Sequence, residues 1–128
     1  MLRILDRQME ALSHDTEREF EATMAAYLRE HYPRWVVPLS EEELLRWVAE
    51  ALHKAVRYGV DTEPEAAQLI LLFAVLGLDA DDRLAWVREV LEDGDLAAIG
   101  KVRRLVALSR EHEVSGLEHV LVYDELQE

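Results

Sequence analysis

Three aspartates in one short stretch resemble the opening of a calcium loop. Asp79, Asp81 and Asp82 would supply carboxylate oxygens, which are the ligands that Ca²⁺ prefers. A calcium loop also has glycine at its sixth position and glutamate at its twelfth, and this chain has Leu84 and Val90 there. We therefore interpret the aspartates as a helix cap within an acidic turn, because aspartate is a favoured capping residue.

The histidines and the lack of cysteine bear on transition metals. No two histidines have the spacing at which one helix binds zinc, and His112 and His119 do not have the arrangement of a metalloprotease motif. The chain has no cysteine, so neither a thiolate zinc site nor a disulfide can form. The sequence predicts no metal site, and a site assembled from distant residues stays the alternative. The histidines are His14, His31, His53, His112 and His119.

The serines, glycines and carboxylates do not form a recognisable catalytic centre. No serine lies in the turn of a nucleophile elbow, and the glycines are too isolated to surround a phosphate. With 27 acidic residues, no pair stands out for general acid and base catalysis. The sequence thus predicts no catalytic residue, no cofactor and no enzymatic activity. An enzyme stays an alternative that would need a cleft with perturbed carboxylates.

The charge balance of the chain limits its partners. Its 27 acidic and 14 basic residues give a formal net charge of -13. Such a charge repels nucleic acid and anionic membrane surfaces, and it favours a basic partner or simply keeps the protein soluble. We predict another protein as the partner, with no nucleic acid and no membrane.

No segment has the pattern of a membrane span or a secretion signal. The longest apolar run, 69–76, is too short to cross a bilayer. The first nine residues mix Arg3, Asp6 and Arg7 with apolar residues, unlike a signal peptide. We therefore expect a cytoplasmic protein.

Apolar residues recur every three to four positions through most of the chain, which indicates amphipathic helices. Ser40 and Glu43 form a capping box at one helix start. Pro33 and Gly59 lie where helices should stop, and Pro38 should keep the residues around it extended. The predicted helices cover about 6–31, 40–58, 64–76, 82–92 and 95–111.

The third predicted helix, 64–76, is apolar on nearly every side after Gln68, as is typical of a helix at the centre of a bundle. The predicted fold is therefore all-α: a single-domain bundle of five to six helices over 1–111, with the third helix central. The C-terminal segment 112–128 follows. There Ser115 and Glu118 could cap a short docked helix, or residues 120–123 could be extended.

The three tryptophans lie off the centres of the apolar stripes. Trp47 and Trp86 lie at stripe edges, and Trp35 lies in the proline-bounded segment. Such aromatic residues either close a core or anchor a partner. If the protein has an interface, we expect these tryptophans and neighbouring acidic residues to form it. The candidate residues are Trp35, Trp47, Trp86, Glu41, Glu42, Asp81 and Asp82.

The fifth predicted helix carries the basic cluster of the chain, which consists of Lys101, Arg103, Arg104 and Arg110. We expect these side chains to balance the protein's own acidic residues, and binding of phosphate or an acidic peptide is the alternative. Ile99 is expected on the inward face of the same helix.

The chain resembles a family of small helical bacterial proteins encoded beside type VI secretion effectors and PAAR-type spike proteins. The resemblance spans most of 6–105, and it consists mainly of helix ends and core positions. It implies an accessory role and supplies no site residues. The matching residues are Gln8, Leu12, Phe20, Leu28, Pro33, Tyr58, Gly59, Glu63, Phe73, Leu76, Gly77, Trp86 and Leu91, together with the acidic turn.

The function that these observations favour is a non-catalytic, protein-binding accessory protein of a bacterial secretion or toxin system. An immunity protein would use acidic residues to block a basic toxin, whereas an adaptor or chaperone would offer an apolar groove to its client, such as a secretion spike component. The alternative is a self-assembling structural protein, in which the apolar third helix forms a homodimer interface.

Overall fold

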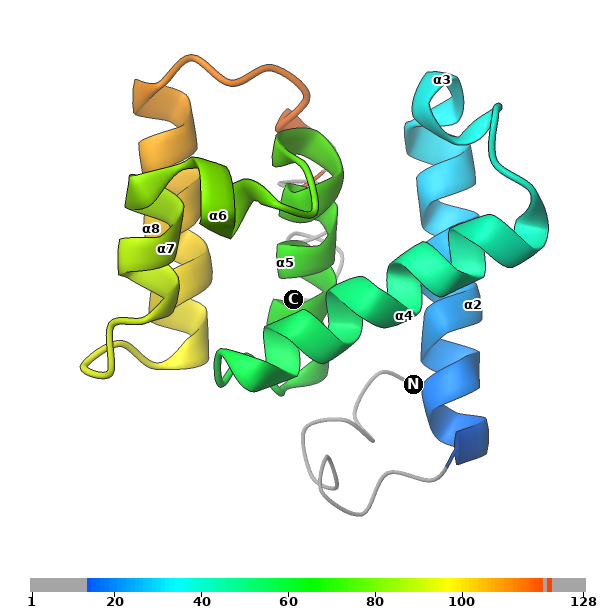
Figure 1. The fold of residues 1–128 in the computed structure, drawn as a ribbon, viewed down its shortest axis with the longest axis horizontal. Helices are drawn as coiled ribbons and strands as arrows, with labels where there is room; N and C mark the ends of the chain where they lie inside the picture. Colours follow the sequence, from blue (N-terminus) through cyan, green and yellow to red (C-terminus); the bar gives the residue numbers. More distant parts are fainter. Residues whose placement is uncertain (1–13, 119, 121–128) are drawn as a thin grey trace.

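Helices make up the fold throughout the part of the chain that the structure describes. A computed structural model describes residues 14–118 and 120, and no β-strand occurs among them. The all-α prediction is therefore confirmed. The helices are α2 (His14–His31), α3 (Pro33–Val36), α4 (Glu41–Arg57), α5 (Glu63–Leu76), α6 (Ala80–Arg83), α7 (Ala85–Leu91) and α8 (Ala98–Glu111) (Figure 1).

Helix α4 crosses the molecule and joins its two ends. It packs against α2 on one side and against α5 on the other, and Figure 1 shows it running from the α2–α3 end towards α5. The predicted capping box starts it: the Ser40 Oγ accepts a hydrogen bond from the Glu43 N–H at 3.0 Å, and the Glu43 carboxylate accepts one from the Ser40 N–H at 2.8 Å. Gly59, with φ of 82°, follows the helix end in a conformation that glycine adopts without strain.

Helix α5 lies at the centre of the core, as its composition predicts. Every residue from Ala66 to Phe73 is buried, so all sides of the helix are covered over two turns. Its largest sets of contacts are with α4 and α8. The core therefore forms around α5, and the outer helices hold the exposed groups.

Several helix boundaries differ from the prediction. Residues 33–36 form the short helix α3 instead of an extended segment, with Pro33 in its first turn, where the missing N–H costs nothing. The predicted helix 82–92 is two helices, because Leu84 between them has extended backbone angles. Helix α8 begins at Ala98 rather than at residue 95. Residues 6–13 of the first predicted helix lie outside the described residues.

Two predictions for the fifth predicted helix, α8, are wrong. Ile99 was expected to face inward but is 44% exposed. Lys101 was grouped with the exposed basic residues, yet it is 8% exposed and lies in the core. The exposed basic residues of α8 are Arg103, Arg104 and Arg110.

The described part of the C-terminal segment packs against the bundle. Leu117 and Val120 are buried. The Tyr32 hydroxyl donates a hydrogen bond to the Gly116 carbonyl at 3.1 Å, and the Gln68 amide donates one to the Val120 carbonyl at 3.3 Å. The alternative is an extended segment over residues 120–123, and of these residues 121–123 lie outside the described residues, as do 124–128.

Within residues 14–118 and 120, no helix combines the length and the apolar character that crossing a bilayer would require.

Candidate functional site

Two of the predicted interface residues, one on α3 and one on α4, are in contact through their rings. The ring centroids of Trp35 and Trp47 are 4.7 Å apart, and the rings are inclined by 70°. Edge-to-face pairs of this kind stabilise each other beyond the area they bury. Both rings are half-buried against the core. We call α3, the residues that connect it to α4 and the first two turns of α4 the tryptophan end.

The tryptophan end also exposes apolar surface. Val37, next to α3, is 79% exposed, which makes it the most exposed large hydrophobic residue in the described part of the chain. A pocket of about 260 Å³ lies beside it, lined by Arg29 and by apolar side chains. Pockets lined mainly by apolar side chains are typical places for a protein to bind a ligand. The apolar lining residues are Pro33, Val36, Val37 and Leu39.

The acidic residues of this end differ in their contacts. Glu41 and Glu42 are both exposed in the first turn of α4, where carboxylates interact favourably with the helix dipole. Glu41 forms an ion pair with Arg29. Glu42 forms no ion pair or hydrogen bond within the described residues. Glu42 is thus the carboxylate here that is available to a basic partner.

Trp86 lies far from the other two tryptophans. It is on α7, which Figure 1 places at the end of the long axis opposite α3. Its ring stacks on His112, with the centroids 4.6 Å apart and the planes 8° from parallel. The expected surface of three tryptophans therefore does not form a single patch.

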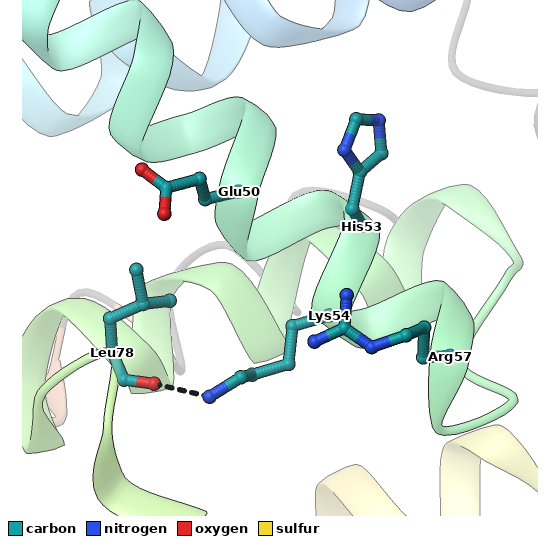
Figure 2. A pocket seen from close by; sticks show the side chains of 5 residues that line it. All are labelled: Glu50, His53, Lys54, Arg57 and Leu78. Atoms are coloured by element: carbon teal, nitrogen blue, oxygen red, sulfur yellow. Dashed lines mark hydrogen bonds between the residues drawn. The ribbon is translucent and has the colours of Figure 1, made fainter.

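A second pocket lies along the C-terminal half of α4, near the α5–α6 connection. Its volume is about 230 Å³. Figure 2 shows its lining residues: four come from α4, and Leu78 comes from the connection. The α4 residues are Glu50, His53, Lys54 and Arg57.

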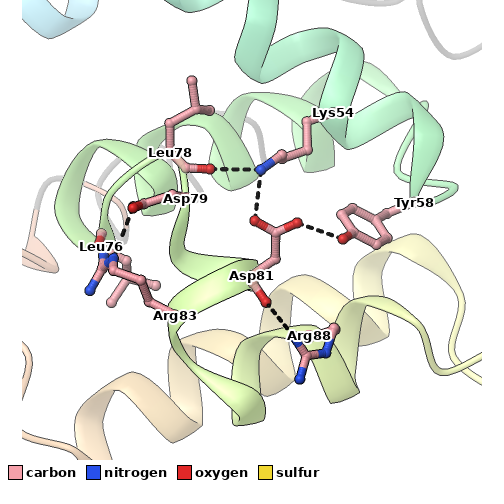
Figure 3. A network of polar contacts seen from close by, with 8 residues as sticks. All are labelled: Lys54, Tyr58, Leu76, Leu78, Asp79, Asp81, Arg83 and Arg88. Atoms are coloured by element: carbon pink, nitrogen blue, oxygen red, sulfur yellow. Dashed lines mark hydrogen bonds and ion pairs between the residues drawn. The ribbon is translucent and has the colours of Figure 1, made fainter.

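Asp81 lies at the centre of a polar network beside this pocket (Figure 3). One of its carboxylate oxygens is 2.7 Å from the Lys54 ammonium, and the other accepts a hydrogen bond from the Tyr58 hydroxyl at 2.6 Å. Lys54 also donates to the Leu78 carbonyl at 2.8 Å. Asp81 is only 5% exposed, so its assignment as a partner-binding residue is corrected: its carboxylate holds α4 and α6 together. Asp82, its neighbour, is exposed.

The network keeps its groups in fixed protonation states at neutral pH. Burial acts to raise the pKa of the Asp81 carboxyl, but the hydrogen bonds from Lys54 and Tyr58 outweigh it and hold this pKa below its ordinary value. Burial and then the hydrogen bond to Asp81 raise the pKa of Tyr58 to about 12. Asp81 therefore stays ionised and Tyr58 stays a donor, which suits a structural contact and not proton transfer.

Two arginines extend the same network. Arg83 donates to Asp79 at 2.9 Å and to the carbonyl of Leu76, the last residue of α5. Arg88 donates to the main-chain carbonyl of Asp81 at 3.3 Å. The acidic turn is thus fastened to the end of α5 and to α7. Asp79 directly precedes α6, but its carboxylate accepts from Arg83 and from no helix N–H, so the predicted side-chain cap is not found.

Lys101, which its charge predicts to be exposed, is a second buried cation. Its ammonium donates to the Tyr58 carbonyl at 2.6 Å and to the Leu91 carbonyl at 2.7 Å. These carbonyls lie at the C-terminal ends of α4 and α7, where helix carbonyls lack intrahelical partners. Its spacing of four from the buried Leu105 was the signal that could have placed it inside.

The remaining basic residues of α8 lack acidic partners in the part of the chain that the structure describes. Within the described residues, Arg103, Arg104 and Arg110 form no ion pair. The expected internal pairing of this cluster is therefore not observed there. Nor do the described residues contain a group of three or more histidine, aspartate or glutamate side chains that could hold a metal ion.

Comparison of the chain with protein-family models, with curated proteins and with solved structures finds no match. The resemblance to proteins encoded beside secretion effectors thus stays a prediction from the sequence.

Proposed function

We propose that this protein is a non-catalytic accessory protein of a bacterial secretion or toxin system, which binds a partner protein at the tryptophan end. The observation that carries the proposal is the exposed Val37 beside an apolar pocket and the Trp35–Trp47 pair. Tryptophan and other aromatic residues are enriched among the residues that contribute most to the binding energy of protein interfaces.

The surroundings of this surface define the chemistry of the partner. The pocket of about 260 Å³ accommodates an apolar side chain from a partner segment. Glu42 and the net charge of -13 favour basic residues next to that side chain, because complementary charges speed association. The same net charge opposes binding of a second copy of the chain. A basic toxin or a secretion spike component with an apolar anchor fits these requirements.

The apolar surface favours the adaptor or chaperone form of this proposal over the immunity form. An immunity protein that blocks a basic toxin needs exposed carboxylates, and the burial of Asp81 removes one of the candidates. An adaptor needs an apolar groove for its client, and the tryptophan end offers an apolar pocket. The proposal includes a cytoplasmic location, where such an adaptor would meet its client before secretion.

The test begins with capture of the partner by the tagged full chain, followed by identification by mass spectrometry. The dissociation constant of the purified complex is then measured by calorimetry for wild type and Val37→Ser. We expect Val37→Ser to weaken binding at least about tenfold, because interface anchors contribute more than 1 kcal/mol each. The matched control is Ile99→Ser, which changes another exposed aliphatic residue, on α8, and should leave binding unchanged.

Two results would overturn the proposal. Equal losses for Val37→Ser and Ile99→Ser would show that the tryptophan end is not the binding surface. A mass that rises with protein concentration, with no toxin or spike component captured, would support the self-assembling alternative.

Glu42→Gln should slow association and reduce its salt dependence without a comparable change in the dissociation rate.

A further inference from the structure

The pocket near the α5–α6 connection contains opposite charges on one helix face. Its four residues from α4 are at positions 50, 53, 54 and 57, a spacing that places them on one side of the helix. Leu78 adds an apolar wall. The charges that remain uncompensated by neighbouring groups determine which ligand this pocket can bind.

Two of the basic side chains already have partners. Lys54 is held by the Asp81 carboxylate at 2.7 Å and by the Leu78 carbonyl at 2.8 Å. The His53 imidazole is 3.5 Å from the Glu17 carboxylate, and Figure 2 shows its ring turned away from Leu78. Neither group leaves a full positive charge for a ligand.

Glu50 and Arg57 are different. Neither forms an ion pair or a hydrogen bond with any residue in the ranges 14–118 and 120. They cannot pair easily with each other, because seven residues of helix separate their backbones by about 10 Å. Figure 2 shows the Glu50 carboxylate on the side of Leu78 and the Arg57 guanidinium extending along α4 towards Lys54. The pocket thus offers one carboxylate and one guanidinium, separated along an apolar wall.

We propose that this pocket binds a small zwitterion whose ammonium and carboxylate groups are separated by an aliphatic segment, as in an ω-amino acid or a dipeptide. The ligand's ammonium pairs with Glu50, its carboxylate pairs with Arg57, and its aliphatic part lies against Leu78. Such a ligand has no net charge, so the net charge of -13 does not repel it as it would repel a simple anion. Arg57 suits the carboxylate because a guanidinium donates two parallel hydrogen bonds to it.

The probe is 6-aminohexanoate, titrated into the ¹⁵N-labelled full chain and followed by amide chemical shifts. Saturable shifts should centre on the pocket residues of α4 and on Leu78. Hexanoate and hexylamine each retain one of the two charges, and they should bind at least about tenfold more weakly because one charge-assisted hydrogen bond is lost. Dialanine in a parallel titration distinguishes a peptide source from a non-peptide one. Hexanoate that binds as tightly as 6-aminohexanoate would overturn the proposal.

The variants separate a zwitterion site from an anion site. Glu50→Gln and Arg57→Gln should each weaken binding of 6-aminohexanoate about tenfold or more. At an anion site, Glu50→Gln would instead strengthen binding, because it removes a repelling charge. Both residues are exposed, so the variants should keep the wild-type melting temperature. Glu89→Gln and Arg104→Gln make the same changes at exposed positions of α7 and α8 and should leave the affinity unchanged.

Discussion

The tryptophan end and the polar network around Asp81 depart from ordinary packing in opposite ways. At the tryptophan end, Val37 leaves an apolar side chain 79% exposed. In the network, an aspartate that is 5% exposed accepts hydrogen bonds from Lys54 and Tyr58. A buried polar group is an informative exception to the pattern of a globular protein, and the exposed valine becomes one here because a pocket with apolar lining lies beside it.

The two exceptions have different consequences. Burying an ion pair costs desolvation energy. The attraction between the two charges and their hydrogen bonds offsets that cost only while both residues are present. The network is therefore sensitive to the loss of any one of its partners. The exposed valine contributes little to the folded state, because its side chain remains in water, and it is available to a partner that covers it. We expect stability to depend on the polar network around Asp81 and partner binding to depend on the tryptophan end.

The largest expected effect follows from removing one member of the buried pair. Asp81→Ala leaves the Lys54 ammonium without its carboxylate in a site where its side chain is 15% exposed. We expect a loss of about 3 kcal/mol in the free energy of unfolding, because a buried charge without its partner is strongly destabilising. Urea denaturation followed by circular dichroism measures it.

The neighbouring exposed residue is the control for this change. Asp82→Ala should change the free energy of unfolding by no more than about 0.5 kcal/mol. The double variant Lys54→Met with Asp81→Leu should regain much of the lost stability, since it removes both charges together. If Asp81→Ala and Asp82→Ala cost the same, the ion pair does not stabilise the fold.

A smaller loss is expected at the second buried cation. Lys101→Met leaves the Tyr58 and Leu91 carbonyls without the donor that they share. We expect the free energy of unfolding to fall by about 2 kcal/mol, the cost of leaving buried acceptors unpaired. The same denaturation experiment on Arg104→Met, at an exposed position of α8, should show a change near zero. Equal effects at the two positions would contradict the structural role of Lys101.

The lowered pKa of Asp81 predicts a smaller effect that depends on pH. The folded state holds this pKa below its unfolded value, so the stabilisation is present above the unfolded pKa and is lost as pH falls through the folded one. The difference in unfolding free energy between wild type and Asp81→Asn should be constant from about pH 5 to pH 8 and should shrink below about pH 4. A difference that grows on acidification would show that the sign of the shift is wrong.

Local chemistry predicted the helix ends that it determines by itself. The Ser40–Glu43 capping box and the glycine after α4 act within a few residues, and both are found as expected. The central position of α5 was also predictable, because a helix that is apolar on all sides is stable only when it is covered on all sides.

Tertiary contacts determine the three features that the sequence did not predict: the helix at 33–36, the burial of Asp81 and the burial of Lys101. Proline at position 33 is compatible both with an extended segment and with the first turn of a helix, and burial of Val36 in the core accompanies the helical choice. An aspartate in an acidic turn looks exposed until the fold brings Lys54 and Tyr58 to it. The charge of Lys101 predicts an exposed side chain. Its burial is favourable because the ends of α4 and α7 bring the Tyr58 and Leu91 carbonyls to its ammonium.

The smallest expected change in stability is at the tryptophan end itself. Val37→Ser should alter the free energy of unfolding of the isolated chain by no more than about 0.5 kcal/mol, because the side chain already lies in water. Its neighbour provides a matched control: Val36 is 5% exposed against 79% for Val37, and Val36→Ser should cost about 2 kcal/mol through lost burial and an added hydroxyl.

The comparison of the two valines is informative because they are adjacent and chemically identical. A large loss for Val37→Ser in the isolated chain would mean that this valine packs against the protein's own residues, which would remove the reason for expecting a partner there. A loss confined to Val36→Ser leaves Val37 as an apolar side chain that the fold itself does not use. Any weakening of partner binding by Val37→Ser would then reflect the interface, since the folded chain would be as stable as wild type.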